Sequence, residues 1–257
     1  MQVVILAGGS PSTISEGTTG IPKPMAEIGN QPILWHIMKH FASYGFQEFV
    51  ICGGYKVEIL KDYFKDYYIY QSDIMVDLQT NQVTILKGVS ENWKVTVIDT
   101  GLHTGTEKRV SLAKEYIKED TFLVTYGDCL SDVDLNRLME CHRRHGKKVT
   151  MMVANPTGRN AALEIDERDE YHGIKSQGSE IQSWVNACTY VMERSAFEYM
   201  IADGSLENGF LQLASAENQV TIYRHGGFWT PIETLRDKKN LETMWLEDAA
   251  PWKSWEE

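Results

Sequence analysis

The sequence predicts an α/β protein with a Rossmann-like, mostly parallel sheet, helices on both faces of that sheet, and a small appended β-rich region. Up to about residue 154, short continuous apolar runs alternate with segments whose apolar residues recur at helical spacing. Such runs are typical of strands buried on both faces, and regular strand–helix alternation indicates a parallel sheet. From about residue 155 the pattern changes to short strands separated by polar loops.

Each expected element has a local signal. Residues 3–6 are a continuous apolar run, which predicts the first buried strand. The helix expected over 32–44 begins at Pro32, whose fixed φ suits a first turn, and it places Ile33, Ile37 and Phe41 at helical spacing. The same signals predict strands near 49–52, 83–87, 94–98, 121–126, 148–153, 161–165, 186–192 and 219–223, and helices near 56–66, 107–118, 133–144, 194–202 and 233–246.

The length of 257 residues suits one large domain. We expect a nucleotide-binding core over 1–154 and a substrate-side and oligomerisation region over 155–257. No clean linker or internal repeat divides the two parts. Three tryptophans near the C-terminus, Trp245, Trp252 and Trp255, are expected to pack against the core or a neighbouring subunit.

Charge and composition exclude several classes of partner. The net charge of −11 argues against binding a nucleic-acid backbone or an anionic membrane surface. No apolar run approaches the roughly 20 residues that span a bilayer, and the first residues lack the features of a signal peptide. The four cysteines form no C-x-x-C pair, so we expect reduced thiols and a cytoplasmic location.

The first candidate for chemistry is the stretch that follows the first strand. Its residues are Leu6, Ala7, Gly8, Gly9 and Ser10. Open α/β sheets bind ligands beyond the carboxyl ends of their strands, and glycines there let backbone N–H groups approach a phosphate. A tight turn without a ligand explains the two glycines equally well.

The second candidate is Lys23, which stands between Pro22 and Pro24. Flanking prolines predict a stiff, extended segment, which would fix the stem of a charge meant for phosphate. The alternative is a solvated loop lysine.

Two acidic residues are candidates for a metal site. Asp128 follows the apolar strand near 121–126, and Mg²⁺ usually keeps one or two protein carboxylates together with phosphate oxygens. Glu233 follows a glycine and aromatic cluster where a helix is expected to start. The alternatives are turn or cap aspartates, with Asp132 able to cap the helix near 133–144, and an acid that favours the helix dipole at Glu233.

Taken in order, the segments LAGG, IPKPM, TYGD and GFWTPIETLRDK resemble the sugar-1-phosphate nucleotidyltransferases. The segments ILWHIMK, DTGLHT and APWK resemble the cytidylyl branch of that family, and the resemblance runs from the first residue to the C-terminus.

The resemblance implies transfer of CMP from CTP to a sugar 1-phosphate, with Mg²⁺ as cofactor, release of pyrophosphate, no covalent enzyme intermediate, and a homo-oligomer. It implies that residues 6–10, Thr104 and Gly127 contact nucleotide, and that Lys23 and Arg109 neutralise phosphate. It also implies that Asn186 and Arg109 contact substrate and that Asp128 and Glu233 hold Mg²⁺.

The departures from the family pattern fall on its chemistry. Pro11 and Thr13 stand where the family has a glycine and a phosphate-clamping arginine, and residues 1–22 contain no Lys or Arg. The E-K-P motif is absent from 176–181, residues 160–162 replace F-G-A, and Glu107 is expected to add negative charge beside a phosphate site. After Asn186, the two family glycines are Ala187 and Cys188, and Glu233 replaces an aspartate.

Three hypotheses follow from these departures. The chain is an active cytidylyltransferase with a changed acceptor, a weak or inactive paralogue that binds nucleotide as a regulatory subunit, or a structural protein that keeps the fold alone. The presence of Lys23, Arg109 and Asp128 favours the first hypothesis, and the missing arginine and lysine favour the second.

Overall fold

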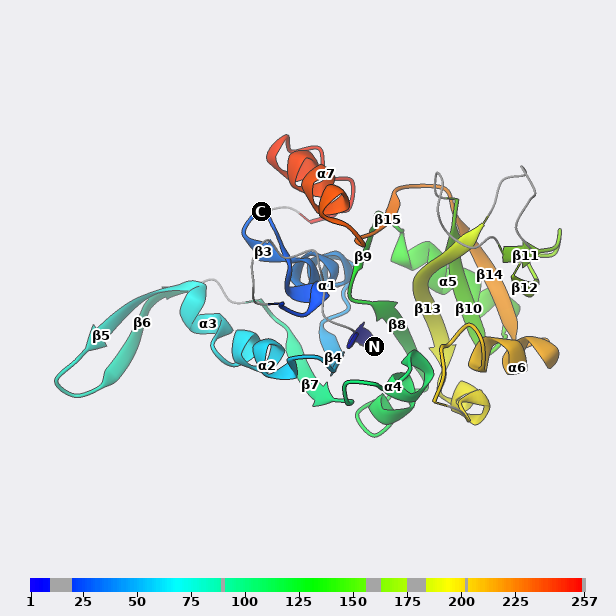
Figure 1. Cartoon of the computed structure of the whole chain (residues 1–257), viewed down its shortest axis with the longest axis horizontal. Coiled ribbons are helices and arrows are strands. Elements are labelled where there is room, and N and C mark those ends of the chain that lie inside the picture. The colour runs from blue at the N-terminus through cyan, green and yellow to red at the C-terminus, as the bar shows by residue number, and fades with distance from the viewer. Residues whose placement is uncertain (10–19, 89–90, 156–162, 175–183, 202, 256–257) are drawn as a thin grey trace.

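Seven strands form one sheet in the order β14-β10-β13-β8-β1-β4-β7 (Figure 1). The computed structural model describes residues 1–9, 20–88, 91–155, 163–174, 184–201 and 203–255. The strands of this sheet are β1 (Gln2–Ala7), β4 (Glu48–Gly53), β7 (Lys94–Asp99), β8 (Thr121–Tyr126), β10 (Val149–Ala154), β13 (Val185–Glu193) and β14 (Val220–His225). Among these strands only β13 runs antiparallel to its two neighbours, so the prediction of a mostly parallel sheet is confirmed.

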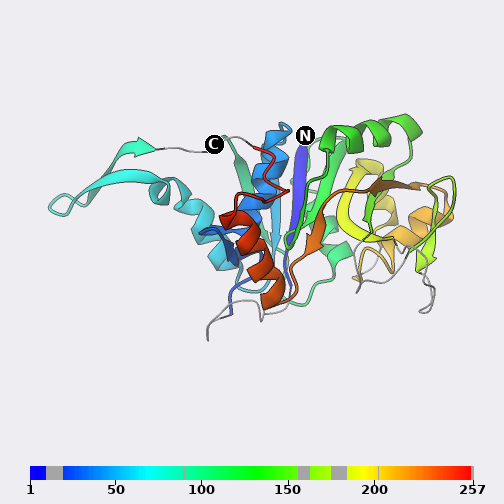
Figure 2. The same cartoon turned by 90° about the horizontal axis from the view of Figure 1, so that it is seen from above.

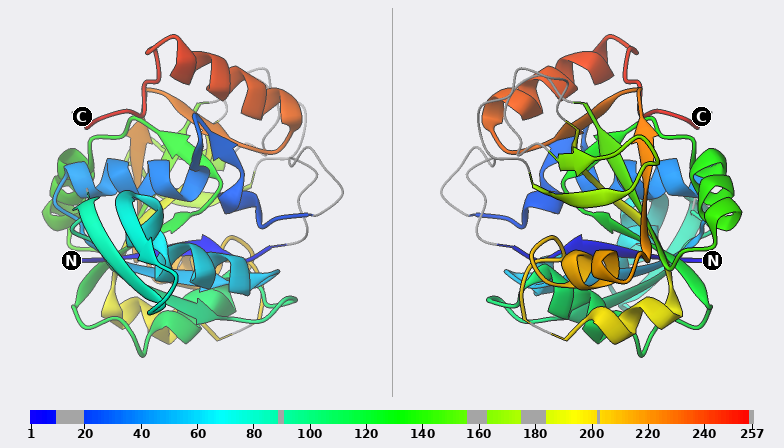
Figure 3. Two further views of the ribbon diagram at one scale, coloured as in Figure 1. Left: turned by 90° about the vertical axis from the view of Figure 1, so that its left-hand side faces the viewer. Right: turned by 90° about the vertical axis from the view of Figure 1, so that its right-hand side faces the viewer.

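Strand β1 shows why the sheet is buried on both faces. Val3 and Ile5 join one hydrophobic cluster, whereas Val4 and Leu6 join the other, because successive side chains of a strand point to opposite faces. The first cluster includes residues of α1 (Ile33–Ser43), α2 (Val57–Lys65) and α5 (Leu135–His145). The second includes residues of α4 (Thr106–Ala113), the 3₁₀ helix η2 (Arg194–Tyr199) and α6 (Phe210–Ala216). The prediction of helices on both faces is therefore confirmed, and Figure 3 shows α7 and α4 on opposite sides of β1.

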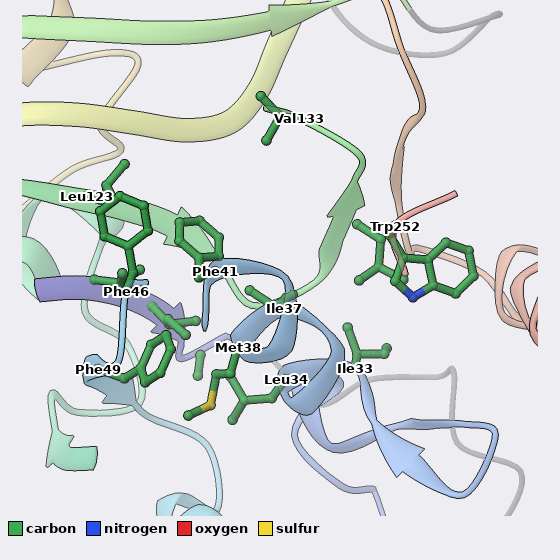
Figure 4. Close-up of a cluster of buried hydrophobic side chains, with 14 of the residues drawn as sticks. Ile33, Leu34, Ile37, Met38, Phe41, Phe46, Phe49, Leu123, Val133 and Trp252 are labelled. Atoms are coloured by element: carbon green, nitrogen blue, oxygen red, sulfur yellow. The ribbon is translucent and has the colours of Figure 1, made fainter. Parts of the chain in front are cut away.

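Helix α1 carries the side chains that fill the first cluster (Figure 4). Ile33, Leu34 and Met38 are each 0% exposed. Trp252, from the segment after α7 (Leu235–Leu246), is also 0% exposed and belongs to the same cluster. Packing of the tryptophan tail against the core is thus confirmed for Trp252.

Most expected elements are present, with differences at their ends and in their partners. The strand expected near 83–87 is β6, which pairs outside the main sheet, and the helix expected over 194–202 is the short η2. Helix α7 begins two residues later than expected, after a capping box formed by Thr234 and Asp237. The expected strand near 161–165 is β11 (Leu163–Ile165). The sequence patterns did not predict α6 and eight short elements, which are η1 (Lys23–Met25), β2 (Glu27–Ile28), β3 (Gln31–Pro32), α3 (Tyr67–Tyr70), β5 (Ser72–Asp77), β9 (Cys129–Ser131), β12 (Tyr171–Ile174) and β15 (Trp229–Pro231).

Strands β5 and β6 (Gln82–Gly88) form an antiparallel ribbon that projects away from the body of the protein (Figures 1 and 2). Apolar side chains on both strands are exposed, with Leu86 at 63% and Met75 at 52%. An isolated two-stranded ribbon is at best marginally stable in water, and exposed apolar side chains that gather on one element are typical of an interaction surface.

Both parts of the predicted division contribute to the same sheet, since β13 and β14 from the second part flank β10 from the first. The boundary near residue 154 therefore stays a functional prediction. Within the described residues, no helix is both long and apolar enough to cross a bilayer.

Candidate active site

The candidate site lies along the carboxyl ends of the parallel strands. Strand β1 ends at Ala7 and leads into Gly8, next to the end of β4 at Gly53 and the end of β8 at Tyr126. Arg109 lies on α4 and reaches this edge from the face of the sheet that carries the second hydrophobic cluster. Its guanidinium lies so close to Gly8 that a Cβ there would stand 2.1 Å from Nη1.

Arg109 is 2% exposed and binds three neutral oxygens from two segments, the end of β4 and the β7–α4 connection. Nη1 donates to the Gly53 carbonyl at 3.2 Å and to the Thr100 hydroxyl, and Nη2 donates to the Leu102 carbonyl at 3.2 Å. Burial lowers the pKa of the guanidinium from its usual value. The nearby Asp203 and Asp99 carboxylates oppose that lowering, so the guanidinium keeps a positive charge close to the backbone of Gly8.

Lys23 and Asp128 form an ion pair at the same edge, with Nζ 2.9 Å from Oδ2. Burial alone would lower the pKa of Lys23. The negative charges of Asp128 and, more weakly, of Glu233 have the larger combined effect and raise this pKa above its usual value. The predicted extended segment is wrong at Lys23, because residues 23–25 form one 3₁₀ turn, η1. A proline in a first helical turn has no N–H that the turn requires, so Pro24 allows it.

Gly127, just after β8, contacts both the end of β1 and the η1 turn. Its N–H donates to the Leu6 carbonyl at 2.9 Å, and a Cβ would stand 2.9 Å from Cγ of Pro24 and 3.1 Å from the Leu6 oxygen. The missing side chain lets the end of β8 approach both the η1 turn and the end of β1. Gly127 thereby brings Asp128 to Lys23.

Glu233 reaches the site through pairing between β9 and β15. Pro231 pairs with Cys129, and the N–H of Ile232 donates to the Asp128 carbonyl at 2.9 Å. Glu233 is exposed and stands just before the α7 cap, so Asp237, and not Glu233, is the acid in the first helical turn. Helix α5 is likewise capped by Asp134, not by Asp132.

Two carboxylates with phosphate and water oxygens fit what Mg²⁺ requires. Asp128 and Glu233 supply those carboxylates from neighbouring backbone segments, and both act on Lys23. Within the described residues, no group of three or more His, Cys, Asp or Glu side chains is arranged to hold a metal by itself. A donor set of two carboxylates leaves the remaining ligand positions of Mg²⁺ to phosphate and water oxygens.

Thr104 contacts Thr100, which is one of the residues that bind Arg109. Its hydroxyl donates to the Thr100 carbonyl at 2.5 Å, and Thr100 in turn donates to the Gly53 carbonyl at 2.5 Å. Thr104 therefore stands in the β7–α4 connection at the rim of the site, and its hydroxyl proton is used by the backbone.

Asn186 lies on β13, the neighbour of β8 on the side away from β1. Its amide nitrogen donates to Tyr190 at 2.5 Å and to Glu207 at 2.7 Å, and its oxygen accepts from the Cys188 N–H at 2.9 Å. Cys188 has φ of +63°, in the left-handed region that favours glycine. The glycine that the family pattern places there has this conformational reason.

Glu107 does not lie beside the phosphate site, where the sequence placed it. It is 0% exposed, and its carboxylate accepts from the Phe210 N–H at 3.1 Å, where α6 begins. Its own N–H donates to the Gly204 carbonyl at 3.0 Å. The expectation of negative charge beside the phosphate site is therefore wrong, because Glu107 points to the 203–210 segment and holds it.

Glu207, in that segment, is a candidate site residue that the sequence patterns did not reveal. Its Oε1 accepts from Tyr126 at 3.0 Å, from Asn186 at 2.7 Å and from Tyr190 at 3.4 Å. No motif marks it, since it lies in a polar loop before an unpredicted helix. Its tie to Asn186, a residue already singled out, could be found only in three dimensions.

Several of the positions singled out in the sequence lie outside the described residues. These are Ser10, Pro11 and Thr13 in the first loop, and the departures at 160–162 and 176–181.

This geometry can bind a nucleoside triphosphate and neutralise its phosphates. A glycine edge over a buried guanidinium, a lysine and a paired carboxylate at the end of β8 define a nucleotide-phosphate-binding α/β protein. The family model described as "Nucleotidyl transferase" matches residues 2–206, and the chain belongs to that family.

Full-length relatives narrow the comparison. The chain is 38% identical over 258 residues to the glucose-1-phosphate cytidylyltransferase of Salmonella typhi, covering 100% of both chains. It is 36% identical over 257 residues to the probable glucose-1-phosphate cytidylyltransferase of Bacillus subtilis, covering 99% of this chain and 100% of the relative.

Solved structures share the fold. HddC from Yersinia pseudotuberculosis complexed with GMP-PN superposes with a TM-score of 0.73 at 22% identity, covering 95% of this chain and 99% of that one. The inositol-1-phosphate CTP transferase from T. maritima gives 0.72 at 15% identity, covering 98% and 96%.

Proposed function

We propose that this protein transfers CMP from CTP to a sugar 1-phosphate and releases pyrophosphate. A phosphate oxygen of the acceptor attacks the α-phosphorus of CTP, a new P–O bond forms, and the bond from the α-phosphorus to the bridging oxygen of the β-phosphate breaks. The observation that carries the proposal is the Lys23–Asp128 pair beside the Gly8 edge in a chain with 38% full-length identity to a glucose-1-phosphate cytidylyltransferase.

The residues of the site act by positioning and by neutralising charge. Lys23 has a raised pKa and is therefore protonated at neutral pH, where it meets phosphate oxygens. Arg109 lies close behind Gly8, is held by the Gly53 carbonyl, Thr100 and Leu102, and supplies positive charge to the phosphates from that side. Leu6, Ala7, Gly8, Gly9, Ser10, Thr104 and Gly127 form the nucleotide side, and Asn186 belongs to the acceptor side.

Asp128 and Glu233 are the residues that would hold Mg²⁺. The ion, when bound, supplies positive charge that screens the two anionic substrates from one another. We further propose that the reaction takes place in the cytoplasm, where the free thiols found at all four cysteines are stable.

The test is pyrophosphate release from CTP and a panel of sugar 1-phosphates, with Lys23→Ala compared with Lys39→Ala. Lys39 is a matched control, because it forms an ion pair with Glu91 at the same 2.9 Å and contributes no contact to the site. We expect Lys23→Ala to lower kcat/KM by on the order of 10³-fold, as for loss of a charge that stabilises a transferring phosphoryl group. Lys39→Ala is expected to keep wild-type turnover.

Equal turnover in the two variants would refute the role of Lys23. CTP binding by wild type without turnover on any acceptor would instead support the regulatory paralogue, which the missing clamp arginine favours. Failure to bind any nucleotide would support the third hypothesis, a structural protein that keeps only the fold.

We also propose that the chain forms a homo-oligomer through the β5–β6 ribbon, which exposes apolar side chains, and not through the 155–257 region where the sequence analysis expected the contact. Replacing Leu86 with lysine is expected to lower the mass measured by analytical ultracentrifugation. A wild-type protein that sediments as a monomer would refute this proposal.

A further inference from the structure

The Glu207 carboxylate is held at one oxygen and open at the other. Oε1 accepts all three hydrogen bonds from Tyr126, Asn186 and Tyr190, whereas Oε2 accepts none of those found in the described part of the chain. Burial, and next the nearby Glu207 charge, raise the pKa of Tyr126 well above its usual value, so this phenol stays protonated and donates. The carboxylate is thus fixed in orientation while one oxygen keeps its capacity to accept.

The backbone around Glu207 is fixed as firmly as its side chain. The N–H of Leu206 donates to the Thr106 hydroxyl at 2.9 Å, and the Glu107 carboxylate accepts from Phe210 at 3.1 Å. Both anchoring residues open α4, the helix that also carries Arg109. A partly exposed carboxylate with this much support resembles a pre-organised binding group more than a solvated surface acid.

Glu207 lies on the acceptor side of the reacting centre. The glycine edge follows β1 on one side of β8, whereas Asn186 and its partner Glu207 stand on the β13 side. In-line attack at the α-phosphorus requires the acceptor to approach from the side opposite the leaving pyrophosphate. With the triphosphate on the β1 side, the acceptor meets the β13 side.

The side chain of Asn186 has little capacity left for substrate. Both amide hydrogens are used, on Tyr190 and Glu207, and its oxygen accepts from Cys188. Asn186 therefore positions Glu207. A carboxylate repels phosphate and accepts hydrogen bonds from hydroxyl groups, so it suits the sugar ring of the acceptor and not its phosphate.

We propose that Glu207 is a specificity-determining residue, which accepts a hydrogen bond from a ring hydroxyl of the acceptor sugar. The inference rests on the proposed function and adds the group that selects the acceptor.

The test measures kcat/KM of wild type and Glu207→Gln with glucose 1-phosphate and with its 2-deoxy, 3-deoxy and 4-deoxy analogues. Glu217→Gln is the matched control, since Glu217 accepts from the Tyr199 hydroxyl at 2.7 Å at the far end of α6. We expect wild type and Glu217→Gln to reject one deoxy analogue by about 10- to 100-fold, the worth of a hydrogen bond to a charged group. Glu207→Gln should lose most of this discrimination while the KM for CTP stays within about twofold.

The outcomes separate the inference from the proposed function. Turnover by wild type with equal discrimination in Glu207→Gln overturns the inference alone, and no turnover by wild type on any acceptor overturns both. If Glu207→Gln unfolds, as thermal melting would show, Tyr126→Phe replaces it, because that variant removes a donor to Oε1 and keeps the charge. Weakened discrimination in Tyr126→Phe at an unchanged KM for CTP supports the inference, and full discrimination refutes it.

Discussion

Acid should destabilise this protein through His36, a residue that the active site does not use. His36 is 0% exposed on α1. Its Nε2 lies 2.8 Å from the Ile28 carbonyl, which fixes the proton there, and its Nδ1 accepts from the Trp252 indole at 3.4 Å. A second proton on the ring would set two N–H groups against one another in an apolar surrounding.

The size of the effect follows from the pKa. Burial, opposed by the Ile28 carbonyl, lowers the pKa of His36 from 6.5 to about 4. The difference is worth roughly 3 kcal/mol at about 1.4 kcal/mol per pKa unit. Because the folded-state pKa is the lower one, the unfolded chain binds more protons between these values, so stability falls as the pH drops from 6.5 to about 4 and levels off below.

The assay is urea unfolding of wild type and His36→Gln at several pH values between 7 and 4. Gln does not titrate, so we expect the loss of unfolding free energy between pH 7 and pH 4.5 to be smaller in the variant by about 2–3 kcal/mol. His103, which is exposed, gives the control His103→Gln, whose pH profile should match wild type. A variant as acid-sensitive as wild type, or a His36 pKa near 6.5 by NMR, would refute the reasoning.

Three further predictions concern the site and are checked by chemical denaturation. Gly8→Ala should cost about 1–3 kcal/mol by overpacking against the pinned guanidinium, whereas Gly9→Ala, where a Cβ meets nothing within 4 Å, should have a clearly smaller cost; equal costs would contradict the close approach. Arg109→Lys should lower the free energy of unfolding by about 2 kcal/mol, because an ammonium cannot reach all three oxygens that the guanidinium binds. An unchanged denaturation midpoint would show that these three hydrogen bonds do not stabilise the fold. Cys188→Gly should raise stability by about 1 kcal/mol by relieving the left-handed backbone, and a lower midpoint would argue that the thiol contributes more than the strain costs.

The sequence was sufficient for the sheet and for the first part of the site. Buried parallel strands are continuous apolar runs, and their carboxyl ends meet at one edge, so Gly8 and Asp128 could be placed together from the sequence, whereas Lys23 was singled out by its two prolines and the family resemblance. The β5–β6 ribbon was only half predicted, because strand β6 looks the same whether it joins the main sheet or projects into solvent.

The acceptor side was less predictable because its residues act through contacts distant in sequence. Glu107 appeared to be a charge beside phosphate, and only its bond to Phe210, 103 positions away, shows that it anchors a loop. Glu207 carries no motif, and its partners lie 21 and 81 positions away. Arg109 was expected to neutralise phosphate, which stays a prediction; what the sequence patterns did not reveal is that Gly53, Thr100 and Leu102 hold its guanidinium.

The place of β13 in the sheet sets the order in which the protein can fold. This strand lies between β8 and β10, although both precede it in the chain. Strands β8 and β10 therefore cannot join into one sheet until β13 is inserted between them, a step that closes long loops and is slow for that reason. Until then β8 presents an open edge that invites aggregation. Asn186 is carried on β13, so the acceptor half of the site is complete only once β13 has paired with β8, and a chain caught before that pairing would have a nucleotide edge without an acceptor side.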